Sequence, residues 1–309
     1  MRQGELVPKG KWTGPPVGGV AAPLPIILPE PGERFAVTAT RLATVAPGHP
    51  AESWLNFIAQ VAWGQHEAVR ASAPSLRSIS IERAVEERVP PLAAHRRTLD
   101  ASWQHGLRCV MDFLRDHVLP GEARAVMDDL DRRRPEALDE LAGAFLDGAV
   151  PAAEAGHALY VAAALQVHFT ILAGRLLADS LRLLPQRGLC PCCGSTPLAG
   201  VVTASGRAPG CRYLHCSLCS TAWNHVRAVC INCGQAGKLS LQCIEGETGL
   251  VKAETCGHCG TYSKVLYERE DSRLDPVADD LASLGLDLLV AEAGWSRHAP
   301  NPLLLVGEE

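Results

Sequence analysis

The sequence lacks a strong excess of charge of either sign. Lysine and arginine number 29 against 34 aspartate and glutamate residues, which gives a formal net charge of -5 over 309 residues. Proteins that bind nucleic acid or an acidic membrane surface usually present a basic face, because phosphate contacts supply much of the affinity. The charge balance therefore gives no reason to expect either partner.

Motifs that mark common catalytic sites are also missing. The chain contains no phosphate-binding glycine-rich loop, no His-Glu-x-x-His pair and no nucleophile elbow. Five histidines are scattered over the helical-looking part without a nucleophile or carboxylate at a meaningful spacing: His66, His105, His117, His157 and His168. We therefore expect a protein that is not an enzyme.

No export signal and no clear membrane span are visible. Residues 20–29 are apolar, but Pro23, Pro25 and Pro29 would break the helix of a signal peptide. The most apolar stretch, Ala158–Gly174, has 17 residues and includes Gln166 and His168. A bilayer needs about 20 mostly apolar residues, so we expect a buried helix in a cytoplasmic protein rather than a membrane insertion.

Cysteine, in contrast, is abundant and placed in a repeat. Eleven of the twelve cysteines lie between positions 190 and 259, and eight of them form Cys-x-x-Cys pairs. In each of two blocks, 22 residues separate the first pair from the second, and the blocks are offset by 40 residues, which indicates a tandem duplication. The predicted ligand sets are Cys190, Cys193, Cys216 and Cys219 in the first block, and Cys230, Cys233, Cys256 and Cys259 in the second.

This spacing predicts two metal sites. In a reducing compartment, a Cys-x-x-Cys turn offers two thiolates to one ion, and a second turn brought alongside completes a tetrahedron. Gly194, Gly234 and Gly260 each follow the second cysteine of a pair, where the turn favours a residue that tolerates positive φ. Four thiolates suit Zn(II) or a single iron ion, and the sequence does not choose between them. The sites could be purely structural or have a redox or metal-sensing role.

The remaining thiols and two histidines near the pairs have alternative interpretations. Cys192 lies inside the first turn, where an exposed thiol could exchange disulfides or accept sulfur, or where it could simply be a variable turn residue. We expect Cys211 and Cys243 to be small strand residues and Cys109 to lie in a helical core. His215 and His258 could replace a cysteine ligand, but eight cysteines already fill both sets.

These patterns predict an α+β chain in which a mainly helical N-terminal domain is followed by two tandem ribbon modules and a C-terminal helix. A helix over about 152–184 should be central to the helical domain, and Asp275 and Pro276 resemble a helix start. Residues 270–309 sum to -7 and residues 190–269 to +3, so the acidic end should pair with the cysteine region. The expected boundaries are a Pro/Gly-rich arm at 1–33, the helical domain at 34–187, the ribbons at 188–227 and 228–269, and the acidic end at 270–309.

Several segments together resemble the FdhE family of formate dehydrogenase accessory proteins. The resemblance extends from about residue 34 to 306. Its most specific parts are in the C-terminal half, and two shorter matches lie in the helical half. The matching segments are 190–195, 212–219, 221–227, 252–256, 262–264, 279–289 and 301–303, together with 48–50 and 163–168. Cys192 and the long N-terminal arm are the departures.

The resemblance implies an assembly factor rather than a catalyst. Family members are cytoplasmic, bind the catalytic subunit of a respiratory formate dehydrogenase before its export by the twin-arginine route, and hold iron in rubredoxin-like cysteine motifs. This favours iron as the cofactor at both sites, with zinc as the alternative. Two other functions compete: a rubredoxin-like redox or thiol protein, and a nucleic-acid-binding zinc-ribbon protein. Whether the chain forms a homodimer is left open.

Overall fold

The computed structural model describes residues 22–72, 74, 80–96 and 99–304. The predicted Pro/Gly-rich arm lies outside these residues from 1 to 21. The remaining residues of that arm, 22–33, belong to the folded protein. A short strand, β1 (Ile26–Ile27), pairs with the sheet, and the first helix begins at Pro31. Pro31 stands in the first helical turn, where a missing backbone N–H costs nothing.

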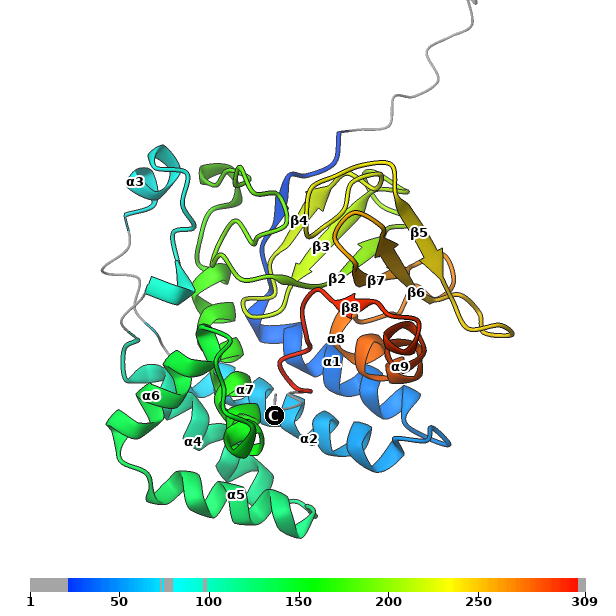
Figure 1. Ribbon diagram of the computed structural model, residues 1–309. Coiled ribbons are helices and arrows are strands. Elements are labelled where there is room, and N and C mark those ends of the chain that lie inside the picture. The colour runs from blue at the N-terminus through cyan, green and yellow to red at the C-terminus, as the bar shows by residue number, and fades with distance from the viewer. Residues whose placement is uncertain (1–21, 73, 75–79, 97–98, 305–309) are drawn as a thin grey trace, which may run out of the picture.

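The N-terminal half is helical, as predicted (Figure 1). The breaks between helices fall at or near the proline and glycine positions of the sequence, such as Pro120-Gly121. Its helices are α1 (Pro31–Val45), α2 (Glu52–Ala71), α3 (Ile81–Glu86), α4 (Ser102–Arg115), α5 (Gly121–Arg132), α6 (Pro135–Leu146) and α7 (Ala155–Gly174), with short 3-10 turns at Ala94–Arg96, Ala152–Glu154 and Ala178–Ser180.

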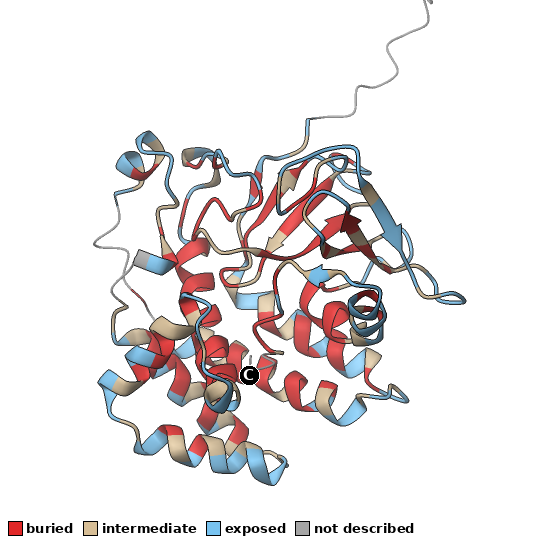
Figure 2. Cartoon of the chain, viewed as in Figure 1, coloured by how far each residue is buried: buried red, intermediate tan, exposed pale blue. Residues whose placement is uncertain are grey.

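Helix α7 forms the centre of this half. Every residue from Ala158 to Ala173 is buried, and the helix packs against α2, α4 and α6 (Figure 2). Among the described residues, the segment Ala152–Gly174 is the one helical stretch long and apolar enough to cross a membrane, and most of it is enclosed by the rest of the protein. The apolar run is thus the buried core helix that the sequence predicts.

The central helix is shorter than predicted. It ends at Gly174 rather than near residue 184. A Cβ at position 174 would lie 2.6 Å from Cγ of Pro31, so glycine at this point allows the start of α1 to cross the end of α7 closely.

The strands of the two cysteine blocks join in one sheet. β2 (Pro197–Val202), β3 (Arg212–Cys216) and β4 (Ala222–His225) form one antiparallel set, and β5 (Leu239–Gln242), β6 (Val251–Cys256) and β7 (Thr261–Tyr267) form another. The sets join through parallel pairing of β2 with β7, in which Gly200 faces Val265. The strand order is β1-β4-β3-β2-β7-β6-β5, and β8 (Ser296–Arg297) pairs with β7.

Two short helices, α8 (Pro276–Leu281) and α9 (Leu284–Glu292), follow β7 (Figure 1). α8 lies between the sheet and α1, and α9 packs against β6 and β8. Asp275 caps α8 by accepting hydrogen bonds from the backbone N–H groups of Val277 and Ala278, so the predicted helix start is confirmed. One continuous cluster of buried residues runs from the helices into the sheet and α8. The α+β class is therefore correct, with helical and cysteine regions built on a common core.

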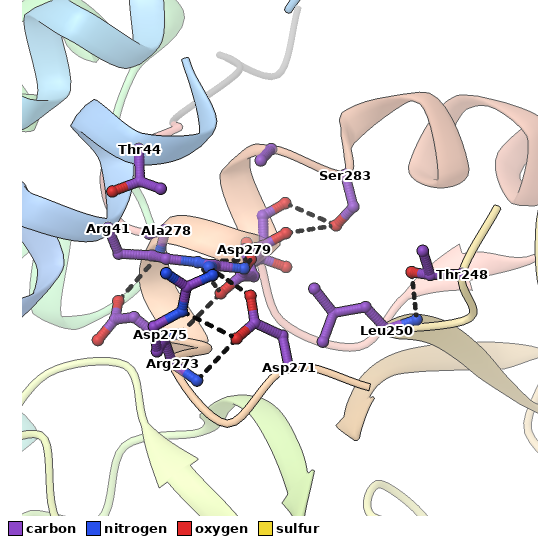
Figure 3. Close-up of polar contacts among 12 residues, drawn as sticks. Arg41, Thr44, Thr248, Leu250, Asp271, Arg273, Asp275, Ala278, Asp279 and Ser283 are labelled. Atoms are coloured by element: carbon purple, nitrogen blue, oxygen red, sulfur yellow. Dashed lines mark hydrogen bonds and ion pairs between the residues drawn. The ribbon is translucent and has the colours of Figure 1, made fainter. Parts of the chain in front are cut away.

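The acidic C-terminal region pairs with two parts of the protein. The buried Nζ of Lys264 on β7 lies 3.3 Å from Oδ1 of Asp280 and 2.5 Å from Oδ2 of Asp287, which agrees with the predicted contact to the cysteine region. The same region also binds Arg41 of α1 (Figure 3). Arg34 of the same helix pairs with Asp275. Contact with the helical half was not predicted from the charge sums.

Candidate metal centres

The first four-cysteine group joins the turn before β2 to the turn between β3 and β4. Sγ of Cys190 lies 3.5 Å from Sγ of Cys219, and Sγ of Cys193 lies 3.4 Å from Sγ of Cys216. Backbone N–H groups of Leu218 and Cys219 point at Sγ of Cys216 from 3.4 Å. The four side chains are buried, and their sulfur atoms lie within 4.8 Å of one another.

The second group repeats this arrangement. Sγ of Cys230 lies 3.8 Å from Sγ of Cys259, and Sγ of Cys233 lies 3.7 Å from Sγ of Cys256. These pairs correspond to those of the first group at an offset of 40 residues. The structure therefore brings all eight cysteines together in the two sets that the sequence spacing indicates.

The turns have the backbone conformation that the glycines suggest. Gly194, Gly234 and Gly260 have φ values of 82°, 71° and 71°, and each donates its N–H to the carbonyl of the first cysteine of its pair. The remaining turn has Ser220 at this position, with a φ of 59°. All four turns thus use the left-handed region, and three of them use the residue that enters it without strain.

The geometry fits one metal ion per group. A metal–sulfur distance of about 2.3 Å in a tetrahedron places the sulfur atoms about 3.8 Å apart. The measured distances of 3.4 to 3.8 Å are close to this value. They are far from the length of an S–S bond, which is about 2.05 Å, and all of these cysteines are free.

The electrostatics of the first group also favour a cation. Burial raises the pKa of Cys190 and Cys216 well above the usual value of a thiol. Four thiolates in such an environment would need a positive charge among them, which a divalent ion supplies. The donor set of four sulfurs suits zinc or iron, and each group could hold one ion.

Two threonines lie next to the sulfurs, and the sequence patterns did not predict these contacts. Oγ1 of Thr221 lies 3.2 Å from Sγ of Cys219, and Oγ1 of Thr261 lies 3.0 Å from Sγ of Cys259. A hydroxyl at this distance can donate to a metal-bound thiolate and so influence its basicity. The sequence contains a pattern that could indicate this contact: a threonine stands two residues after the last cysteine in both blocks.

The other cysteines differ from one another in exposure. Cys192 is buried, so the exposed thiol that disulfide exchange would need is not observed. Cys243 is exposed and follows the end of β5, and Cys211 precedes the start of β3. The prediction that both are strand residues is therefore wrong. Cys109 is partly buried against the helical core.

The histidines beside the pairs are not part of either sulfur group in the described residues. Burial lowers the pKa of His215 to about 4, so its ring is neutral at physiological pH. His258 is exposed, and its Nε2 lies 3.3 Å from the carbonyl of Ala236.

One polar contact in the helical half was not predicted. Oγ of Ser102 lies 3.1 Å from Nδ1 of His168 and also hydrogen-bonds to Asp100. The His168 side chain is only 2% exposed, inside the core around α7. The contact between Ser102 and His168 therefore joins α4 to α7.

Comparison with known proteins identifies relatives over almost the whole chain. Three family models match in succession: FdhE, N-terminal, at residues 23–185; FdhE, central domain, at 189–227; and FdhE, C-terminal domain, at 228–304. The boundary between the last two models separates the two four-cysteine blocks.

Individual proteins agree with the family models. The chain is 37% identical to Protein FdhE homolog of Edwardsiella ictaluri over 94% of both chains, and 35% identical to Protein FdhE of Escherichia coli over 92% of both. The crystal structure of the FdhE protein from Pseudomonas aeruginosa superposes with a TM-score of 0.82 at 30% identity, covering 92% of this chain and 99% of that one. The chain belongs to the FdhE family.

Proposed function

We propose that this protein is a non-catalytic accessory protein that binds the immature catalytic subunit of a formate dehydrogenase in the cytoplasm, before export by the twin-arginine route. Membership of the FdhE family supports an accessory role related to formate dehydrogenase. The observation that carries the proposal is that the three family models together span residues 23–304, including both four-cysteine groups.

The metal-binding part of the proposal assigns one ion to each four-cysteine group. The ligands would be Cys190, Cys193, Cys216 and Cys219 at the first site and Cys230, Cys233, Cys256 and Cys259 at the second. Iron is the proposed metal and zinc the alternative, because four thiolates accept either. Metal analysis of protein purified without oxygen from its native host should find two ions per chain.

The partner is tested with an affinity-tagged full chain in its native host. The tagged protein should co-purify with the formate dehydrogenase catalytic subunit that still carries its export signal, and a deletion strain should lose most formate dehydrogenase activity. Re-expression of the chain should restore that activity. Normal activity in the deletion strain would contradict the accessory role. Sedimentation of the same preparation decides whether the chain also forms a homodimer.

The second candidate function is a rubredoxin-like redox protein. It is favoured by the second group, in which Cys233 and Cys259 are only partly buried and an iron ion would lie close to solvent. Anaerobically purified protein should then be coloured and bleach reversibly with a reductant. Colourless zinc protein would exclude this function. The charge balance favours neither nucleic acid nor membrane insertion as an alternative.

A further inference from the structure

The two cysteine groups have the same geometry but different surroundings. In the first group, Cys190, Cys193 and Cys219 are 0% exposed and Cys216 is 5% exposed. In the second group, Cys230 and Cys256 are similarly buried, but Cys233 and Cys259 are partly open to solvent. The duplication has therefore produced one closed and one open site.

Helix α7 covers one side of the first group. Nε2 of Gln166 donates a hydrogen bond of 2.8 Å to the carbonyl of Ser217, in the turn that carries Cys216 and Cys219. Oγ1 of Thr170 lies 3.3 Å from Oγ of Ser220 in the same turn. Both contacts come from the most buried helix of the protein, so this cover cannot move without disturbing the core.

The segment before α4 covers the other turn of the first group, which carries Cys190 and Cys193. The N–H of Leu92 donates to the carbonyl of Cys192 at 2.8 Å, and the N–H of Ala94 donates to the carbonyl of Cys193 at 2.9 Å. Pro90 also lies against Gly194, with its Cγ 3.0 Å from the position of a Cβ there. The first turn is thus held by backbone hydrogen bonds to a part of the chain about 100 residues earlier.

The second group has less cover within the described residues: Gly188 lies close to the carbonyl of Ile231, between Cys230 and Cys233, but the other turn has no such neighbour. A Cβ at Gly234 or Gly260 would meet no atom within 4 Å. Asn232 and His258, the residues beside the partly open cysteines, are exposed. In the described part of the chain, backbone hydrogen bonds join these turns to Gln235 and Lys238 in the same module and to Ser296 on β8.

We propose that the two sites have divided roles: the first holds its ion permanently, and the second exchanges a thiophilic divalent cation with solutes. The observation that carries this is the contrast between the partly open Cys233 and Cys259 of the second group and the turns of the first group, which Gln166 and Leu92 hold. The inference rests on the proposed metal binding and is independent of the formate dehydrogenase partner.

The exchange rate of a bound ion depends on how open its site is to solvent, because the ion leaves by replacement of its ligands. An incoming chelator atom must reach the metal, each metal–sulfur bond is replaced by a metal–chelator bond, and the released thiolates take protons from water. At the second site the chelator approaches past Cys233 and Cys259. At the first site the contacts from α7 and from Leu92 and Ala94 must open first, and each such opening has a free-energy cost.

The experiment uses full-length zinc-loaded protein, excess EDTA and N-ethylmaleimide, quenched at intervals. Trypsin cleavage after arginine and lysine places the four ligand turns on separate peptides: 188–207, 213–227, 228–238 and 253–264. The exposed Cys243 lies alone on peptide 239–252 and serves as a thiol that should react at once. Mass spectrometry of these peptides assigns each release phase to a site without any mutation.

The expected result is two release phases of one zinc ion each, with peptides 228–238 and 253–264 labelled at least tenfold faster than the first-site peptides. Equal labelling rates, or faster labelling of the first site, would overturn the inference. If the protein bound no zinc, the metal assignment itself would fail together with this inference. If zinc release showed two clear phases but the protein did not co-purify with the formate dehydrogenase subunit, only the accessory role would be contradicted.

A variant gives a second measurement. Cys233→Ser should remove the fast phase and keep the slow one, because the open site loses a ligand while the closed site is untouched. The matched control, Cys243→Ser, changes an exposed cysteine that belongs to neither group and should keep both phases. A fast phase that persists in Cys233→Ser would overturn the assignment.

Discussion

Two nitrogen atoms of the Arg41 guanidinium on α1 donate hydrogen bonds to the carboxylate of Asp279 on α8. Its Nε lies 3.0 Å from Oδ2 and its Nη2 lies 2.6 Å from Oδ1, and both side chains are buried (Figure 3). Nη1 of the same guanidinium donates to Asp271 at 2.8 Å. A bidentate arginine–carboxylate pair is directional, so this contact constrains how α8 is oriented on α1.

Replacing Arg41 with alanine should lower the free energy of unfolding by about 3 kcal/mol, because the buried Asp279 would lose its partner. Urea denaturation of the metal-loaded protein measures the change. The matched control is Arg70→Ala, which removes an exposed arginine 3.5 Å from Glu67 and should cost less than about 0.5 kcal/mol. Similar unfolding midpoints for the two variants would show that the buried pair does not hold the helices together.

Asp271 should contribute a stability that depends on pH. The backbone N–H of Arg273 and the side chain of Arg41 lower its pKa to about 2, against about 3.9 in an unfolded chain. Since the folded pKa is the lower one, the contribution is complete above the unfolded pKa and disappears as the pH falls from about 4 to 2.

The variant Asp271→Asn tests this dependence. It should be less stable than the native protein at pH 7 by about 1 kcal/mol, since the side chain is partly open to solvent. The difference should vanish near pH 2, and acid-induced metal loss affects both proteins alike. A difference that stays constant from pH 7 to pH 2 would contradict the shifted pKa.

The sequence predicts the parts of this molecule that depend on local pattern. The two cysteine groups follow from Cys-x-x-Cys turns that repeat at a fixed spacing, and the start of α8 follows from Asp275 before Pro276. Each turn and the helix start are decided by neighbouring residues, and the repeat indicates which turns belong together, so a pattern in the sequence is enough to identify them.

Pairing between residues that are distant in the chain is not indicated by any local pattern in the sequence. Nothing local indicates that Gly200 on β2 would lie beside Val265 on β7, which makes one sheet from two modules. The cover of the first metal group by Leu92 and Gln166 is likewise formed by residues that are remote in the chain. The same limit explains why the difference in exposure between the two cysteine groups is visible only in the fold.

Gly174 should be intolerant of even a small side chain. A Cβ there would lie 2.6 Å from Pro31, whose ring cannot rotate away, so Gly174→Ala should destabilise the protein by roughly 1 to 3 kcal/mol. The control is Gly143→Ala on α6, where a Cβ meets no atom within 4 Å. That change should stabilise by up to about 1 kcal/mol through helix propensity. Thermal unfolding that shifts in the same direction for both would refute the close crossing.

Gly234 should affect metal affinity without touching the metal. Its φ of 71° is unfavourable for alanine although space is available, so Gly234→Ala should cost about 1 kcal/mol in the folded turn. Because metal binding and folding of the ribbon are coupled, this cost should appear as a roughly fivefold weaker affinity at the second site. The control is Gly257→Ala, which lies between the ligands of the same site but has no positive φ and leaves a Cβ 3.5 Å from Lys238. Competition with a chelator of known affinity measures both variants. Equal weakening by both would mean that added bulk near the sulfurs, rather than the left-handed backbone, governs the site.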